Sequence, residues 1–164
     1  KSNVSRGCRL FRKVFREISQ DYPTVQTNEA FIDAFTMWLV RDPEDLDVVV
    51  LPNMFGDIAT DLASVLQGGM GMAASANIGD NHMLFEPVHG SAFELIGKSQ
   101  ANPIATILAA AMMVEFLGET EEAAAIRRAV SENLSDARVR TPDIGGCSTT
   151  SEVGDDIVRI LGNK

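Results

Sequence analysis

The sequence is short of cysteines, aromatic residues and cations, and these shortages narrow what the protein can do. Cys8 and Cys147 are its two cysteines, and neither lies in a CxxC or Cys/His spacing, so we expect free thiols rather than a disulfide or a zinc site. Lys and Arg number 14 against 23 Asp and Glu, the formal net charge is −9, and no basic run stands out. We therefore expect no nucleic-acid partner.

Long apolar runs and an amino-terminal signal pattern are also missing. No run approaches the length of a membrane span, and the first residues lack the successive regions of a signal peptide. A cytoplasmic protein without a membrane partner is the expectation. The chain starts at Lys1 rather than at Met, and we expect it to have been cut from a longer sequence.

What is present suffices for a folded α/β domain, since 45% of the 164 residues are hydrophobic. The spacing of apolar residues and the positions of Gly and Pro predict helices and short strands. The expected helices cover residues 6–22, 29–40, 56–66, 104–117, 119–134 and 151–161, the last capped by Ser151. The expected strands cover residues 24–26 and 47–51, and residues 72–88 are expected to form irregular loop and a short strand, with a turn at 77–81.

Two carboxylates lie four residues apart in the segment NMFGDIATD, near the expected start of a helix. Asp57 and Asp61 then project from one helix face. The apolar strand before them would end just short of the pair, and open α/β sheets bind ligands at that end of a strand. Because the two acids repel each other, a cation is expected between them. The alternative is that Asp57 caps the helix and Asp61 is solvated.

Other candidates are more ambiguous. The segment from Gly69 to Ala74 matches a loose dinucleotide fingerprint, but a helix rather than a strand precedes it, which favours a glycine-rich helix stop. His89 in PVHGSA could touch a ligand or decorate the surface. Glu94 could bind a ribose diol or be a solvated acid. Asp33 lies within a mostly apolar helix, where a carboxylate needs a partner.

Six segments carry a resemblance to a known family. They are KSNV, FIDAFTMWLV, NMFGDIATD, LFEPVHGSA, GKSQANPIAT and TPDIGG. In this order and spacing they resemble the carboxyl-terminal half of the β-decarboxylating hydroxyacid dehydrogenases, which comprise 3-isopropylmalate, isocitrate, homoisocitrate and tartrate dehydrogenases. The resemblance implies the α/β fold of isopropylmalate dehydrogenase, a layered α/β/α architecture that is not a Rossmann fold. The chain would form part of it, with residues 1–50 in the dimerisation and substrate domain and residues 51–164 in the cofactor domain.

The resemblance also implies roles for individual residues. Asp33, Asp57 and Asp61 match metal ligands, with Asp33 supplied by the other subunit of a dimer. Lys1 matches an active-site lysine that reaches across the dimer interface and would act as general base, and Asn3 and Val4 match positions near substrate and nicotinamide. The cofactor positions are His89, Gly90, Ser91, Ala92, Glu94 and Asn102. Three carboxylates suit Mg²⁺ or Mn²⁺.

The implied function is metal-dependent oxidative decarboxylation of a 2-hydroxyacid with hydride transfer to NAD. Glu94 matches the acid that holds the adenosine ribose in NAD-using members, and an acid there repels the 2′-phosphate of NADP. Short 3-isopropylmalate dehydrogenases are similar in their compact TPDIGG ending, so 3-isopropylmalate is the favoured substrate. Isocitrate, homoisocitrate and a non-catalytic regulatory subunit are the alternatives. A homodimer or higher homo-oligomer would share its active sites.

Two positions depart from the family pattern, since Phe93 replaces a proline and Ser2 replaces an alanine. The first could reshape the cofactor loop, and neither removes a charged group. The tyrosine acid and the substrate-binding arginines of the family are expected upstream of Lys1, so residues 1–164 by themselves are expected to be inactive.

Overall fold

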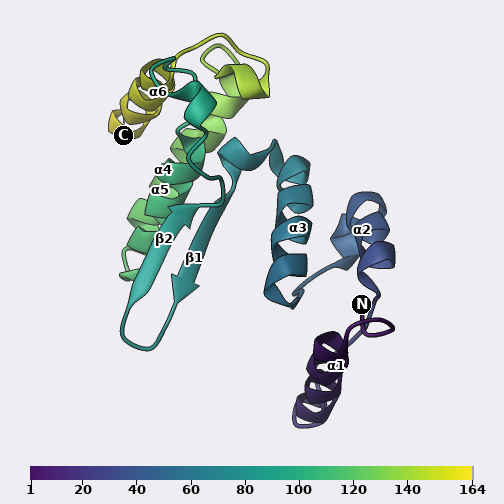
Figure 1. The fold of residues 1–164 in the computed structure, drawn as a ribbon. Helices are drawn as coiled ribbons and strands as arrows, with labels where there is room; N and C mark the ends of the chain where they lie inside the picture. The colour runs from purple at the N-terminus through teal and green to yellow at the C-terminus, as the bar shows by residue number, and fades with distance from the viewer. Residues whose placement is uncertain (164) are drawn as a thin grey trace. The chain divides into compact units, whose positions relative to one another are not determined.

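The computed structural model describes residues 1–163, and this part of the chain divides into two compact units (Figure 1). The first unit runs from Lys1 to Ala63 and the second begins at Ser64. The predicted division into domains at residue 50 stays a prediction. Within residues 1–163, no helix is both long enough and apolar enough to cross a bilayer.

The first unit is built of helices. They are α1 (Arg6–Ser19), α2 (Ile32–Arg41), α3 (Asn53–Ser64) and a 3-10 turn at Pro43–Asp45. Ser5 caps α1 by accepting a hydrogen bond from the N–H of Cys8 through its hydroxyl. Phe35 and Leu39 of α2 pack with Ala59 of α3, and these three residues form a small buried cluster. This cluster fixes α2 and α3, which carry the candidate acids, against each other.

Three predictions for this unit are wrong. Residues 24–26 form a turn, and residues 47–51 are extended without a pairing strand, with the side chain of Val48 89% exposed. An apolar segment becomes a strand only when a neighbour accepts its backbone hydrogen bonds, and the described residues contain a single ladder, which lies elsewhere. Helix α3 begins at Asn53, earlier than expected, so Asp57 lies inside the helix and does not cap it.

The second unit joins a β-hairpin to three helices. Its elements are β1 (Ala74–Ile78), β2 (Met83–Pro87), α4 (Ile104–Phe116), α5 (Thr120–Asp136) and α6 (Thr150–Gly162), with 3-10 turns at Val65–Gln67, Met70–Met72, Phe93–Leu95 and Pro142–Ile144. The strands are antiparallel, with Ala74 opposite Pro87. Where the sequence suggested irregular loop and one short strand, the chain forms a hairpin. The hairpin and α5 lie along α4 (Figure 1).

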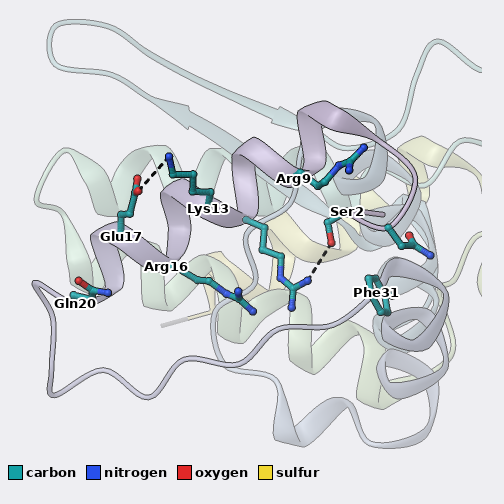
Figure 2. A pocket seen from close by; sticks show the side chains of 9 residues that line it. Ser2, Arg9, Lys13, Arg16, Glu17, Gln20 and Phe31 are labelled. Atoms are coloured by element: carbon teal, nitrogen blue, oxygen red, sulfur yellow. Dashed lines mark hydrogen bonds and ion pairs between the residues drawn. The ribbon is translucent and has the colours of Figure 1, made fainter.

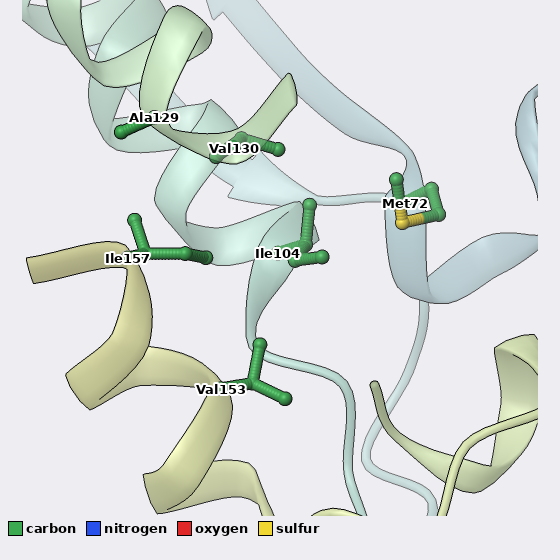
Figure 3. Packing of buried hydrophobic residues seen from close by; sticks show 6 residues of the cluster. All are labelled: Met72, Ile104, Ala129, Val130, Val153 and Ile157. Carbon is green, nitrogen blue, oxygen red and sulfur yellow. The ribbon is translucent and has the colours of Figure 1, made fainter. Parts of the chain in front are cut away.

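The core of the second unit lies where α4, α5 and α6 meet. Figure 3 shows the buried residues that converge there: Met72, Ile104, Ala129, Val130, Val153 and Ile157. The side chains of Ile104 and Val153 are fully buried. Because Ile104 is the first residue of α4, this core also holds the loop that leads into α4.

Helix α6 begins one residue earlier than predicted and has a different cap. Thr149, not Ser151, accepts a hydrogen bond from the N–H of Glu152, and the Glu152 carboxylate accepts one from the N–H of Thr149 at 2.7 Å. The result is a reciprocal capping box. The hydrogen bonds from Thr149 lower the pKa of Glu152.

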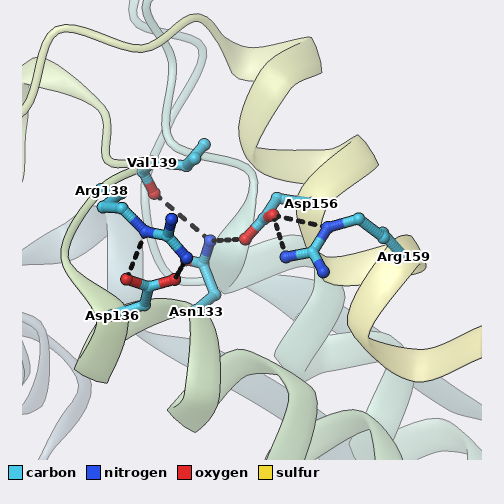
Figure 4. A network of polar contacts seen from close by, with 6 residues as sticks. All are labelled: Asn133, Asp136, Arg138, Val139, Asp156 and Arg159. Carbon is cyan, nitrogen blue, oxygen red and sulfur yellow. Dashed lines mark hydrogen bonds and ion pairs between the residues drawn. The ribbon is translucent and has the colours of Figure 1, made fainter. Parts of the chain in front are cut away.

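A polar network ties the end of α5 to α6 (Figure 4). Asn133 donates to the carboxylate of Asp156 at 2.8 Å and to the carbonyl of Val139 at 3.3 Å. Arg159 binds Asp156 at 2.6 Å and, with the Asn133 hydrogen bond, lowers the pKa of Asp156. Asn133 is almost fully buried, so these two bonds pair the N–H groups of its side chain, which would be costly to leave unpaired.

Candidate functional site

The paired acids of the first unit lie on one exposed face of α3. Asp57 and Asp61 are four residues apart within the helix, and both are exposed. The side-chain amide of Asn53, one turn before Asp57, lies 3.3 and 3.4 Å from the two carboxylate oxygens of Asp57. The predicted common orientation of the two acids follows from this helical spacing.

Asp33 lies in the first turn of α2 and pairs with Lys1. The Lys1 Nζ is 2.8 Å from Oδ2 of Asp33, and their side chains are 35% and 65% exposed. The hydrogen bond from Lys1, supported by the backbone N–H of Ala34, lowers the pKa of Asp33. The partner that the sequence required for Asp33 is therefore Lys1.

The three acids do not form a metal-binding cluster within one chain. Across residues 1–163, no group of three or more His, Cys, Asp or Glu side chains lies close enough together to hold an ion. Asp57 and Asp61 nevertheless fit one, because both are exposed carboxylates on the same helix face and hard divalent cations prefer carboxylate oxygens. That Asp33 of another copy of the chain supplies a third carboxylate, as the resemblance implies, stays a prediction.

Helix α1 carries a cationic groove that the sequence reasoning missed (Figure 2). Its cavity of about 410 Å³ is lined by Ser2, Asn3, Arg9, Arg12, Lys13, Arg16, Glu17, Gln20 and Phe31. Residues 1–16 contain six of the 14 cations and no acid, a signal that averaging over the whole chain hides. Of the two predicted positions next to Lys1, Asn3 lines the groove, whereas Val4 is exposed outside its lining.

Two arginines of this groove are anchored by one acid. Arg12 and Arg16 each contact the carboxylate of Glu29 at 2.5 Å. The hydrogen bond from Arg16 is the main cause that lowers the pKa of Glu29. Lys13 makes only a 3.7 Å contact with Glu17, and both of these side chains are largely exposed. The groove thus keeps a surplus of positive charge.

In the second unit, the predicted cofactor loop follows β2. His89 places its Nδ1 3.0 Å from the carbonyl oxygen of Gly90, and Ala92 adopts a left-handed conformation with φ of 42° before the turn Phe93–Leu95. Glu94 lies exposed in that turn. Phe93, which replaces the family's proline, is 78% exposed, so its ring points to solvent rather than into the core.

Asn102 lies in the loop before α4 and is 8% exposed. Its Nδ2 donates to Oδ2 of Asp143 at 3.0 Å, and its Oδ1 accepts from the N–H of Ile104 at 3.0 Å. Asp143 belongs to TPDIGG, a segment that contributed to the family resemblance without a role for this acid. No local sequence signal could have paired residues 41 positions apart.

The predicted residues thus fall into two groups. The first unit carries Lys1, Asn3, Val4 and the three acids, of which the structure brings Lys1 to Asp33. The second unit carries the loop from His89 to Ala92, with Glu94, and Asn102. Their roles stay predictions.

Comparison with known proteins shows that the chain is similar to several dehydrogenases. A family model described as isocitrate/isopropylmalate dehydrogenase matches residues 1–157. The chain is 48% identical over 162 residues to a 3-isopropylmalate dehydrogenase of Archaeoglobus fulgidus, covering 98% of this chain and 49% of that protein. It is 48% identical over 155 residues to a homoisocitrate dehydrogenase of Methanocaldococcus jannaschii, covering 94% and 44%.

A solved structure agrees with these relatives. The isocitrate dehydrogenase from Methylococcus capsulatus superimposes with a TM-score of 0.88 at 44% identity, covering 93% of this chain and 45% of that one. The chain spans about half the length of the relatives it matches. The predicted fold class, a piece of the layered α/β fold of isopropylmalate dehydrogenase, is confirmed. The match over residues 1–157 shows that the chain belongs to the isocitrate/isopropylmalate dehydrogenase family.

Proposed function

We propose that the protein catalyses the metal-dependent oxidative decarboxylation of a 2-hydroxyacid with hydride transfer to NAD, and that 3-isopropylmalate is its substrate. The observation that carries this proposal is the exposed pair of carboxylates on α3, in a chain that also holds Lys1 against Asp33. Family membership supports the reaction class.

Asp57 and Asp61 would hold the ion together with Asp33 of a second copy. A bound Mg²⁺ or Mn²⁺ supplies positive charge that favours loss of the hydroxyl proton and offsets the negative charge that develops as the carboxyl group leaves. The absence of a three-acid cluster within residues 1–163 agrees with a site completed by two copies. We therefore expect a homodimer or a higher homo-oligomer.

Lys1 would accept the proton of the substrate hydroxyl at its Nζ, directly or through a water. In the structure that nitrogen is an ammonium that donates to Asp33 at 2.8 Å, so it would accept the substrate proton only after losing its own proton to solvent, which binding of the ion by Asp33 would favour. Asn3 lies two residues away, in the cationic groove of α1. The positive surplus there favours the approach of an anionic hydroxyacid, although the whole chain is acidic.

The loop from His89 to Ala92 would receive the adenosine half of the cofactor, with Asn102 at the adenine. Gly90 has no side chain and that of Ser91 is small, so the cofactor can approach the backbone closely there. The exposed carboxylate of Glu94 can accept hydrogen bonds from both hydroxyls of a ribose and repels a 2′-phosphate. This chemistry favours NAD over NADP. The cytoplasmic location stays a prediction.

Two alternatives remain distinguishable by experiment. Isocitrate or homoisocitrate could be the substrate, since relatives of nearly equal identity carry different substrate names. A non-catalytic regulatory subunit is the rival from another class. The presence of Lys1 and all three acids favours the enzyme, because a regulatory paralogue has no need of them.

The test replaces Asp57 by Asn in the full-length protein and measures turnover of 3-isopropylmalate, isocitrate and homoisocitrate with NAD and Mg²⁺. Because second-sphere partners of metal sites already contribute 10- to 100-fold, loss of a ligand should lower kcat by more than about 100-fold. The thermal midpoint should change little, since Asp57 is exposed. Asp80→Asn, on the exposed hairpin turn, is the matched control and should leave kcat unchanged.

Full turnover by Asp57→Asn would contradict the metal role of α3. A wild-type protein that binds NAD but turns over none of the three acids would indicate the regulatory subunit. Chelation with EDTA should abolish activity, and added Mg²⁺ should restore it.

A further inference from the structure

Asn102 uses its side-chain amide inside the protein. The Nδ2 of the amide donates a hydrogen bond to Asp143. Its Oδ1 accepts one from the N–H of Ile104, the first residue of α4. The Nδ2 also lies 3.6 Å from the sulfur of Met72, a core residue. With its donor and acceptor both engaged and only 8% of the residue exposed, this side chain serves as a brace.

The backbone N–H and C=O of Asn102 are separate from the side-chain contacts. Among residues 1–163, neither the N–H nor the C=O of Asn102 forms a backbone hydrogen bond, whereas the carbonyls of Ser99 and Ala101 on the same loop accept from Thr150. An adenine ring presents a donor and an acceptor side by side on its edge, which a free N–H and C=O can satisfy. The brace therefore determines where these backbone groups point.

The absence of a side chain at Gly71 leaves the space in which the side chains of Asn102 and Asp143 meet. A Cβ at this position would lie 2.7 Å from Oδ2 of Asp143 and 2.9 Å from Cβ of Asn102. Gly71 does not have a positive φ, so its backbone conformation does not require glycine. Only the close approach of Asp143 and Asn102 requires glycine at this position. The second glycine of the rejected dinucleotide fingerprint thus has a steric role here.

Asp143 is itself held in place. It lies in the turn Pro142–Ile144, between the fully buried Thr141 and Ile144, which packs against the core of the second unit. Its carboxylate therefore approaches Asn102 from a fixed support. A charged acceptor makes this hydrogen bond stronger than one between neutral groups.

From these contacts we infer that Asp143 is a positioning residue for the adenosine half of the cofactor, acting through the Asn102 amide in the space left by Gly71. This inference rests on the proposed function, in which Asn102 contacts the adenine. Removing the carboxylate should release the amide, let the backbone of residue 102 turn, and weaken NAD binding without changing the chemical step.

The test uses the full-length protein with Mg²⁺ and measures the Kd of NAD by calorimetry, together with kcat and both KM values. Because a hydrogen bond to a charged group contributes more free energy than one between neutral groups, losing it in Asp143→Ala should raise the Kd and KM of NAD by about 10-fold or more. The kcat and the KM of the hydroxyacid should stay within about twofold. Asp143→Asn should restore most of the affinity, because its side-chain oxygen can still accept from Asn102.

Gly71→Ala perturbs the same contact from the other side and should weaken NAD binding in the same selective way. Gly154→Ala is its control, because a Cβ there meets nothing within 4 Å. It should leave the Kd of NAD unchanged. These two variants keep the test informative even if Asp143→Ala folds poorly.

Three results would overturn the inference. The first is an Asp143→Ala protein that binds NAD within twofold of wild type. The second is a parallel loss of affinity for NAD and the hydroxyacid with a lower thermal midpoint, which would show a structural role only. The third is a wild-type protein that binds no NAD, which would overturn the proposed cofactor as well. Unchanged variants of an active wild-type protein would overturn the positioning role alone.

Discussion

At the scale of single residues, the ion pair between Lys1 and Asp33 is the most direct link between structure and chemistry. The hydrogen bond from Lys1 lowers the pKa of Asp33. A carboxyl whose pKa is lower in the folded protein contributes stability above its unfolded pKa, about 3.9, and that stability is lost as the pH falls through the folded value. Both side chains are substantially exposed, so the effect on stability is small.

Replacing Lys1 by Met in the full-length protein should therefore raise the pKa of Asp33 toward its ordinary value. The reason is loss of the largest cause of the shift, the Nζ hydrogen bond. A carbon-detected NMR titration of the carboxyl group measures it. Lys98→Met, which removes an exposed lysine with no ion pair among the described residues, should leave that titration unchanged. An identical Asp33 titration in both variants would show that Lys1 does not hold the carboxylate.

At the scale of elements, α6 shows how local sequence and packing combine. Its start is set by the capping box of Thr149 and Glu152, and its inner face is set by Val153 and Ile157 in the core. Thr150 also donates to carbonyls of the loop before α4. The helix therefore supports the loop that carries Asn102.

Thr149→Ala should destabilise the protein by about 1 kcal/mol, the usual contribution of a helix N-cap. The matched variant is Ser151→Ala, at the cap position expected from sequence, which should change stability by less than about 0.5 kcal/mol because Ser151 is exposed within the helix. Urea unfolding measures both. Equal losses would mean that the capping box is not what starts α6.

The inner face of α6 has its own test. Val153 is fully buried, and Val153→Ala should lower the free energy of unfolding by about 2 kcal/mol, from lost transfer energy and the cavity left behind. Val158→Ala, on the exposed side of the same helix, makes the same chemical change and should be nearly neutral. A similar cost at both positions would contradict the orientation of α6.

At the scale of the whole molecule, the first unit exposes many hydrophobic side chains to solvent. Val48, Val49 and Val50 are exposed, and an apolar cavity of about 340 Å³ is lined by residues of α1, by Tyr22 and Val25, and by Val50. Exposed apolar surface of this kind marks an interaction site. This surface agrees with the prediction that the proposed active site needs more than residues 1–164.

Residues 1–164 produced alone should therefore show no turnover of any of the three hydroxyacids, while the full-length protein is active. A coupled NADH assay at matched concentration measures this. The control is far-UV circular dichroism of the shorter chain, which should retain helical signal from α4, α5 and α6. Activity of the shorter chain with NAD would show that residues 1–164 hold every group that the reaction needs.

Much of this protein followed from local signals. The spacing of apolar residues predicted the helices to within a few residues, because helix formation depends on neighbours one turn away. The motifs led to the family, which the comparisons confirm. The hairpin was missed because the polar turn around Gly79 resembles loop, and its strands are recognisable only when they pair. The predicted strand at 47–51 failed for the converse reason, since it has no partner among the described residues.

The sequence by itself determined where the helices lie, which acids share the face of α3, and to which family the chain belongs, because these depend on spacing along the chain. Only the tertiary structure decided that Lys1 meets Asp33, that cations gather in one groove on α1, and that Asp143 reaches Asn102 beside Gly71. Those contacts join residues separated by up to 41 positions, and only the packing of whole elements brings such distant side chains within hydrogen-bond distance.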